Sequence, residues 1–166
     1  MTVALQRLPL LLFCGLLAAC AARAPLPQVE PQLALPLQLH LQQVGGQSQD
    51  WLLVIQREGR ALRWSLFDPL GVPLARQRLE DGEWQADGLL PPNPQARELF
   101  AALLFALTPA AELTRAYPQQ VRVSPQGRRL LQGEQVRWQA DTAATDGFTL
   151  WLDATQYRVR TLESQP

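Results

Sequence analysis

Cys20 is the residue whose type and position best suit covalent chemistry. A cysteine thiolate is a strong nucleophile, and Cys20 directly follows the small residues of Leu17-Ala18-Ala19. Upstream, Arg7 is the only charged side chain before the apolar run of residues 8–17. A membrane-spanning helix needs about 20 apolar residues, so this run has the length of a signal-peptide core rather than that of a membrane span.

The tetrapeptide Leu17-Ala18-Ala19-Cys20 resembles the bacterial lipobox, in which a peptidase cuts before a cysteine that carries diacylglycerol. The resemblance implies a signal peptide over residues 1–19 and a lipid anchor on Cys20 that attaches the chain to a membrane. Two alternatives remain: an ordinary secretory signal that is cut after Ala24, or an uncleaved membrane anchor. An Asp after the cysteine retains lipoproteins in the inner membrane, and Ala21 stands there instead, which favours the periplasmic face of the outer membrane.

Side chains suited to catalysis or metal binding are sparse. His40 is the only histidine, and its place in an alternating run predicts that it faces solvent. Neither a Gly-x-Ser-x-Gly motif nor a phosphate-binding glycine loop occurs. Glu80, Asp81 and Glu83 surround Gly82 at a turn, where charged residues are ordinary. We therefore expect no enzyme activity, no cofactor and no metal, and the zero net charge gives no reason to expect a nucleic-acid partner.

Apolar residues with a period of two predict antiparallel strands on both sides of a helical segment. Leu37, Leu39 and Leu41, for example, alternate with polar residues, which indicates a strand with one buried face. Turns rich in Gly, Pro and Asp separate such runs at spacings of about ten residues. The predicted strands cover residues 37–42, 51–56, 61–67, 72–79 and 83–86, and then residues 120–124, 129–132, 135–140, 148–153 and 156–162.

The helical segment between the two groups of strands has a central part, residues 99–107, that is apolar on every side. Asn93 and Pro94 suit an N-cap and a first helical residue, and Thr108-Pro109 ends the helix. A helix of this kind is buried, so we expect residues 94–107 to lie against the concave face of the sheet. A short second helix over residues 110–116 follows, and Pro-rich residues 20–36 predict an extended tether.

Arginines alternate with apolar residues in the C-terminal strands. Arg122, Arg137, Arg158 and Arg160 each stand between residues of the predicted buried face, which indicates that the other face is solvated. Two interpretations remain open. The arginines form a patch for anions or lipid headgroups, or they belong to a charged outer face that nearby Asp and Glu residues balance.

The segment Arg63-Trp64-Ser65-Leu66-Phe67-Asp68-Pro69-Leu70-Gly71 resembles the outer-membrane lipoprotein receptor LolB, in which a strand ends in Asn-Pro-Leu-Gly. It is still more similar to uncharacterised LolB-like lipoproteins that are often encoded beside aryl-polyene or fatty-acid-type synthesis genes. The order of lipobox, tether, strands, turn, helix and strands extends the resemblance over nearly the whole mature chain. This chain departs from the receptor in having Asp68 instead of Asn.

The resemblance implies a LolA/LolB-like half-barrel over residues 37–166, mainly β with α (α+β). It would have about 10–11 antiparallel strands closed by one or two apolar helices. It also implies that Leu70, at the turn formed with Asp68, Pro69 and Gly71, protrudes and transfers lipid or lipoprotein. The alternative is that Leu70 folds back onto the sheet. A periplasmic carrier protein is a further partner that the resemblance implies.

We therefore expect a lipoprotein that binds or delivers an acyl-chain-containing lipid or lipoprotein in an apolar cavity. The alternative is a non-enzymatic scaffold or assembly lipoprotein with a filled core. A continuous internal void favours the first function and a packed interior favours the second. The residues expected to line the cavity are Leu62, Trp64, Leu66, Trp84, Leu99, Phe100, Leu103, Leu104 and Leu107.

Overall fold

The computed structural model describes residues 24–45, 48–91, 93–118, 120–144 and 147–162. The expected signal peptide and Cys20 lie outside these residues. Ten strands form one antiparallel sheet in the order β5-β4-β3-β2-β1-β10-β9-β8-β7-β6. The strands are β1 (Leu37–Val44), β2 (Gln49–Glu58), β3 (Ala61–Phe67), β4 (Pro73–Glu80), β5 (Glu83–Ala86), β6 (Val121–Ser124), β7 (Gly127–Gln132), β8 (Gln135–Ala144), β9 (Gly147–Leu152) and β10 (Thr155–Leu162).

The sheet consists of two five-stranded meanders that join where β1 pairs with β10. Neighbouring strands in each meander are consecutive in sequence, so short turns connect them. The first meander ends at β5 and the second begins at β6, and these two strands are the free edges of the sheet. The expected curved α+β sheet is therefore confirmed, and it is not closed into a barrel.

Turn residues explain why the strands end where they do. Between β4 and β5, Asp81 and Gly82 both have positive φ, at 50° and 77°. A two-residue hairpin turn whose twist matches that of the strands requires positive φ at both positions, and Asp-Gly is a preferred sequence for it.

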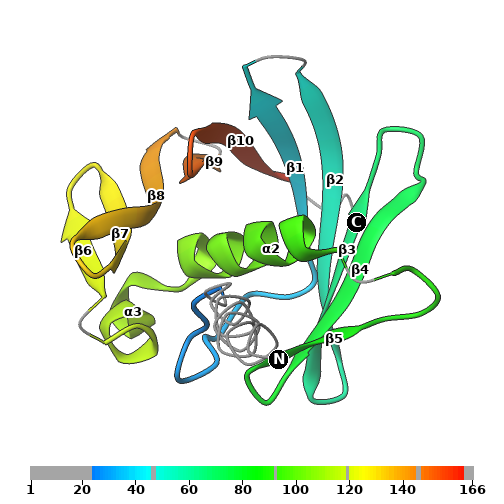
Figure 1. Cartoon of the computed structure of the whole chain (residues 1–166), viewed down its shortest axis with the longest axis horizontal. Helices are drawn as coiled ribbons and strands as arrows, with labels where there is room; N and C mark the ends of the chain where they lie inside the picture. Colours follow the sequence, from blue (N-terminus) through cyan, green and yellow to red (C-terminus); the bar gives the residue numbers. More distant parts are fainter. Residues whose placement is uncertain (1–23, 46–47, 92, 119, 145–146, 163–166) are drawn as a thin grey trace, which may run out of the picture.

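Helix α2 (Pro94–Leu107) crosses the concave side of the sheet, from the edge strand β5 toward the other half of the sheet (Figure 1). The Asn93 side chain caps its first turn by accepting a hydrogen bond from the backbone N–H of Ala96 at 3.0 Å. At the other end, the hydroxyl of Thr108 donates to the carbonyl of Leu104 at 2.7 Å. Helix α3 (Ala110–Ala116) follows and leads to β6.

One hydrophobic core fills the concave side, with α2 at its centre. Alternate residues of the strands point toward α2, as the period of two predicts. Leu99 to Phe105 of α2 are all buried, whereas Leu107 is partly buried at the end of the helix. Every fully buried core residue among those described lies between Leu39 and Val159. A chain that starts at Ala21 therefore retains this core.

Residues 24–36 contain no helix or strand, as their prolines predict, but they pack on the domain from Ala24 onward. The Gln28 N–H donates to the carbonyl of Ala116 at 2.8 Å, at the end of α3. Glu30 forms an ion pair with Arg57 of β2 at 2.6 Å, and Pro31 is buried. This part of the expected tether thus lies against the domain because its Leu and Pro side chains find apolar surface there. No helix in the described part of the chain is long and apolar enough to cross a membrane.

Candidate functional site

The turn between β3 and β4 is built around the side chain of Asp68. The Gly71 N–H donates to the Asp68 carbonyl at 3.0 Å, which closes a four-residue turn. The Asp68 carboxylate accepts two further backbone N–H groups, from Leu70 at 2.9 Å and from Val72 at 2.8 Å. Gly71 has a φ of 82°, a conformation that favours glycine. Asp68, Pro69 and Gly71 thus hold the backbone on both sides of Leu70 in one conformation.

Leu70 points away from the protein at the tip of this turn. Its side chain is 89 % exposed, so the outward one of the two conformations left open by the sequence is adopted. Val72 and Leu74, which follow it, are 52 % and 41 % exposed. We call Leu70, Val72 and Leu74 the apolar turn. Three large apolar side chains exposed so close together in sequence are a surface that would gain from contact with lipid or protein.

Sequence reasoning found Leu70 but missed Val72 and Leu74. A signal was present for Leu74, because it has the same strand parity as Arg76 and Arg78, and those positions face outward. A register shift where Leu66 and Phe67 pair with β4 leaves Leu74 without a partner residue on β3. Such a bulge depends on how two strands meet, which alternation alone does not reveal.

An aromatic cluster lies on the concave face between β3, β5 and the first half of α2. The Trp64 ring centroid is 5.8 Å from that of Trp84 and 5.4 Å from that of Phe100, and Trp84 and Phe100 are 6.0 Å apart. Trp64 and Phe100 are fully buried, and Trp84 on the edge strand is partly buried. The structure therefore brings together the expected cavity residues from strand and helix.

The indole N–H groups of Trp64 and Trp84 are buried without a hydrogen-bond acceptor among the residues that the structure describes. A third buried indole provides a comparison, because the Trp138 N–H donates to the Glu98 carboxylate at 3.0 Å. A buried donor without a partner costs about 1–3 kcal/mol. Two such donors in one cluster indicate a place where a group that can accept hydrogen bonds would be favourable.

The remaining expected cavity residues also belong to the core. Leu62, Leu66, Leu99, Leu103 and Leu104 are at most 5 % exposed. Two pockets of the structure are lined by other residues. The burial of these leucines indicates that, among the described residues, side chains in contact with one another occupy much of the space between sheet and helix.

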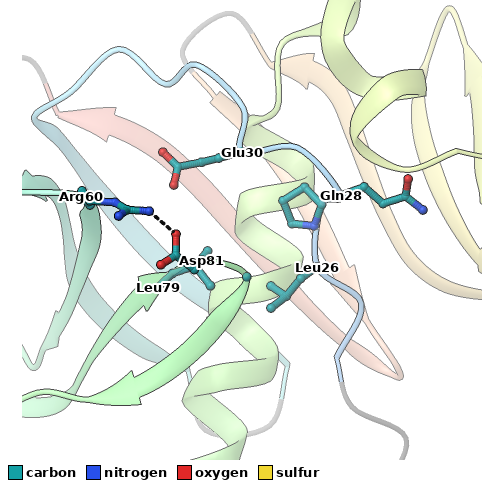
Figure 2. Close-up of a pocket in the computed structure, with 8 residues that line it drawn as sticks. Leu26, Gln28, Glu30, Arg60, Leu79 and Asp81 are labelled. Atoms are coloured by element: carbon teal, nitrogen blue, oxygen red, sulfur yellow. Dashed lines mark hydrogen bonds and ion pairs between the residues drawn. The ribbon is translucent and has the colours of Figure 1, made fainter.

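The first described pocket, of about 290 Å³, lies between the N-terminal segment and the turns that end the β2–β3 and β4–β5 hairpins (Figure 2). Leu26 and Leu79 provide apolar surface, and an ion pair between Arg60 and Asp81 at 2.8 Å stands at its side. Leu79 is also the neighbour of Trp84 across the β4–β5 ladder. Sequence reasoning missed this pocket because it expected the N-terminal segment to lie away from the domain. The full lining is Leu26, Pro27, Gln28, Glu30, Arg60, Leu79, Asp81 and Gly82.

The second pocket, also of about 290 Å³, is mostly polar and is lined by Gln132, Gln135, Val136, Arg137 and Asp153.

Two of the three carboxylates considered for chemistry are engaged in ion pairs. Glu80 pairs with Arg78 at 3.2 Å, and Asp81 pairs with Arg60. His40 lies 2.9 Å from Asp50 on the neighbouring strand, where both side chains are more than a third exposed. Within the described ranges, no group of three or more His, Cys, Asp or Glu side chains could hold a metal ion.

Burial changes the acid–base properties of two tyrosines and one arginine. Desolvation raises the pKa of Tyr117, whose ring packs against Phe105 at 5.4 Å. Burial, together with the charge of Asp153, also raises the pKa of Tyr157. Burial lowers the pKa of Arg128, which donates to the carbonyl of Thr108 after the end of α2. These groups lie in the β6–β10 half of the molecule, and their contacts are structural.

Comparison with known proteins places the chain in a family and gives no functional assignment. No curated protein matches the chain. The family described as "Protein of unknown function (DUF3261)" matches residues 36–164, which include all ten strands and both helices of the described structure. This match covers the open ten-stranded sheet with α2 across it, and the chain belongs to the DUF3261 family.

Proposed function

We propose that the chain is an outer-membrane lipoprotein on the periplasmic side that binds or delivers an acyl-chain-containing lipid or lipoprotein. The observation that carries the proposal is the apolar turn, on which Leu70 is 89 % exposed although the backbone around it is fixed by three hydrogen bonds to Asp68. An exposed leucine on a flexible loop is ordinary. A leucine held outward by a dedicated turn is suited to enter an acyl-chain environment.

The energetics of the apolar turn favour a transient contact. Full burial of one leucine side chain is worth about 1.5–3 kcal/mol. Leu70 alone therefore supports entry into a membrane or contact with an acyl chain without holding the protein there. Permanent attachment would come from the lipid expected on Cys20, since several acyl chains give stable anchoring. A reversible contact at the turn and a permanent one at the N-terminus suit delivery.

The aromatic cluster supports an acyl ligand that carries a carbonyl oxygen. An ester or amide carbonyl at the head of the acyl chain could accept from the indole N–H groups of Trp64 and Trp84, which have no acceptor within the described part of the protein. The partly buried Trp84 lies on the free edge β5, next to Leu79 of the first pocket. A ligand would enter there by displacing side chains or the N-terminal segment.

A second candidate is a scaffold or assembly lipoprotein with a filled core. The observation that favours it is the burial of Leu62, Trp64, Phe100 and Leu103, which are all 0 % exposed. Under this function the apolar turn docks on a protein partner instead of a lipid. The two candidates therefore differ in whether the interior takes up an acyl chain.

Delivery is tested with Leu70→Glu in the lipidated protein. We expect transfer of a fluorescent acyl-labelled lipoprotein to acceptor vesicles to be lost, because a carboxylate cannot enter hydrocarbon without a large desolvation cost. Leu89→Glu is the matched control, since Leu89 is also fully exposed but lies in the loop between β5 and α2. Both variants should keep the thermal stability of the wild type. Unchanged transfer by Leu70→Glu would remove the apolar turn from the mechanism.

Uptake and anchoring need separate measurements. Mass spectrometry of lipids extracted from a chain that starts at Ala21 should detect bound acyl compounds if the protein is a carrier, and none if it is a scaffold.

The anchor is tested by labelling cells with palmitate. Label should enter the wild-type protein and be absent from Cys20→Ala. A wild-type protein that takes up no label would exclude the lipoprotein assignment.

A further inference from the structure

Two pairs of arginines stand directly opposite each other on adjacent strands. Arg63 of β3 is opposite Arg78 of β4, and Arg122 of β6 is opposite Arg129 of β7. Like charges at directly opposite positions of an antiparallel pair are destabilising. Each pair therefore requires either nearby carboxylates or another source of negative charge.

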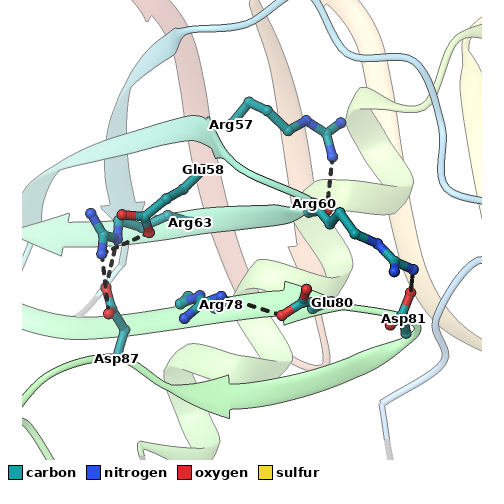
Figure 3. Close-up of polar contacts among 8 residues, drawn as sticks. All are labelled: Arg57, Glu58, Arg60, Arg63, Arg78, Glu80, Asp81 and Asp87. Carbon is teal, nitrogen blue, oxygen red and sulfur yellow. Dashed lines mark hydrogen bonds and ion pairs between the residues drawn. The ribbon is translucent and has the colours of Figure 1, made fainter.

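The first pair is neutralised within the protein, as Figure 3 shows. Arg63 forms ion pairs with Glu58 and with Asp87, both at 2.7 Å, and Arg78 pairs with Glu80 at 3.2 Å. Three carboxylates thus surround two guanidinium groups. On the outer face of this half of the sheet, the charges of the two arginines are therefore balanced within the protein.

The second pair has no such surroundings. Arg122 and Arg129 are exposed, and within the described ranges neither forms an ion pair. The next residue across the sheet from Arg129 is the neutral Gln139, whose side chain donates to the Asp141 carboxylate on the same face of β8, and within the described structure Asp141 forms no ion pair with either arginine. No Asp or Glu occurs between Glu112 and Glu134, whereas four arginines do. The β6–β7 hairpin therefore carries concentrated positive charge in a chain of zero net charge.

We propose that Arg122 and Arg129 bind the headgroups of anionic phospholipids in the membrane to which the chain is anchored. The proposal rests on the lipid anchor of the proposed function. Charge complementarity is the first argument, because two adjacent guanidinium groups offer a fork of donors that matches phosphate oxygens. Arg122 and Arg129 repel each other in the folded protein, and a bound phosphate supplies the negative charge that offsets this repulsion.

The path of the N-terminal segment is the second argument. The backbone of Gln28 is hydrogen-bonded to Ala116 at the end of α3, and β6 begins at Val121, shortly after that helix. Cys20 precedes Gln28 by eight residues. Eight residues span at most about 29 Å when fully extended. Leu26, which is nearer to Cys20, packs beside the β2–β3 and β4–β5 turns, so a lipid on Cys20 would keep both these turns and the end of α3 within about this distance of the membrane.

The exposed edge of the hairpin completes the surface. β6 is the last strand of the sheet, so a membrane that meets it edge-on contacts both faces of the hairpin. Val123, which follows Arg122, points to the opposite face and is 67 % exposed. Its side chain can enter the interface while the arginines bind headgroups.

The test uses a chain that starts at Ala21 and carries no lipid, which retains the described core. Co-sedimentation with vesicles is compared between phosphatidylcholine alone and phosphatidylcholine mixed with phosphatidylglycerol, at low and high salt. We expect binding to the anionic vesicles that weakens with salt. Arg122→Gln combined with Arg129→Gln should weaken it roughly tenfold to thirtyfold, since each basic residue near an anionic surface contributes substantially.

The matched control is Arg76→Gln combined with Arg158→Gln. These two arginines are also exposed and form no ion pair in the described part of the chain, but they lie on separate strands, β4 and β10. We expect the control to retain most of the binding. An equal loss in both double variants would overturn the proposal, because net charge alone would then explain binding. The proposal would also be overturned if the wild-type chain did not bind anionic vesicles at low salt. That result would not bear on acyl delivery by the apolar turn, which the Leu70→Glu transfer assay tests separately.

Discussion

The side chain of Asp68 holds the backbone of the apolar turn in one conformation, which keeps Leu70 exposed. Its carboxylate accepts the N–H groups of Leu70 and Val72, and its carbonyl accepts that of Gly71. The geometry indicates that Asn would also serve at this position, since the amide oxygen of Asn can accept the same two hydrogen bonds. We therefore expect Asn at position 68 to leave the shape of the turn unchanged.

Asp68→Ala should loosen the turn, whereas Asp68→Asn should preserve it. Loss of two hydrogen bonds to exposed backbone groups should lower the free energy of unfolding by about 1–2 kcal/mol. Acyl delivery should fall as well, because Leu70 would no longer be held outward. Urea denaturation and the transfer assay measure the two effects. If Asp68→Asn lost as much stability as Asp68→Ala, the acceptor role of the side chain would be wrong.

The tyrosines control the alkaline limit of stability. The sequence contains no Lys and two Tyr, so between about pH 10 and 12 the tyrosines are the main side chains expected to titrate. Burial raises the pKa of Tyr117, and that of Tyr157 is also raised. A raised pKa in the folded state means that the unfolded chain loses its proton first. Stability is therefore full below about pH 10 and falls above it, at up to about 1.4 kcal/mol per pH unit for each tyrosine.

Tyr117→Phe should reduce this alkaline slope, because Phe has no proton to lose. Denaturation midpoints measured from neutral pH to about pH 12 would show it. Tyr157→Phe serves as the comparison, with a smaller change expected since Tyr157 is less buried than Tyr117. An unchanged slope in Tyr117→Phe would contradict the assignment of the alkaline transition to burial of this phenol.

Helix α2 connects the two meanders through polar contacts as well as through the core. The buried Gln77 of β4 donates to the Asn93 carbonyl at 3.0 Å, at the start of the helix. Farther along, the Glu98 carboxylate accepts from Trp138 and from Arg137 of β8, each at 3.0 Å. The helix is thus fixed to the first meander at one point and to the second at another.

Glu98→Ala should destabilise the protein by about 1–3 kcal/mol, because it leaves the Trp138 N–H buried without an acceptor. Glu98→Gln should lose less, since its amide oxygen can still accept from Trp138 while the ion pair with Arg137 is lost. Thermal unfolding of the two variants would establish the order. Equal losses would mean that the charge of Glu98, rather than its acceptor role, matters.

At the scale of elements, local patterns predicted most of what the structure contains. The helix over residues 94–107 matches α2, and the expected strands match β1–β10, although β1, β2, β7 and β8 run longer. Alternation and capping are local signals, which is why they were sufficient. The roles of Gln77 and Glu98 were not predictable, because each contact joins a strand to α2 or to its N-cap across many intervening residues. The packing of residues 24–36 on the domain was missed for the same reason.

At the scale of the whole molecule, the sheet topology separates the apolar turn from the β6–β7 hairpin, the two surfaces for which we propose different functions. The apolar turn joins β3 and β4, next to one edge of the sheet, and the β6–β7 hairpin forms the other edge. Figure 1 places them toward opposite ends of the longest axis. No local pattern predicts this separation, because it follows from the pairing of β1 with β10, the first strand with the last.

Salt should distinguish the two surfaces in a single experiment. With the unlipidated chain, Leu70→Glu and the double variant of Arg122 and Arg129 should each weaken association with anionic vesicles. High salt screens exposed charges but not apolar contact. At high salt the arginine variant should therefore match the wild type, while Leu70→Glu remains weaker. If high salt instead restored the vesicle binding of Leu70→Glu to the wild-type level, the loss at low salt would come from repulsion between the new carboxylate and the anionic vesicle. The apolar turn would then have no part in membrane contact.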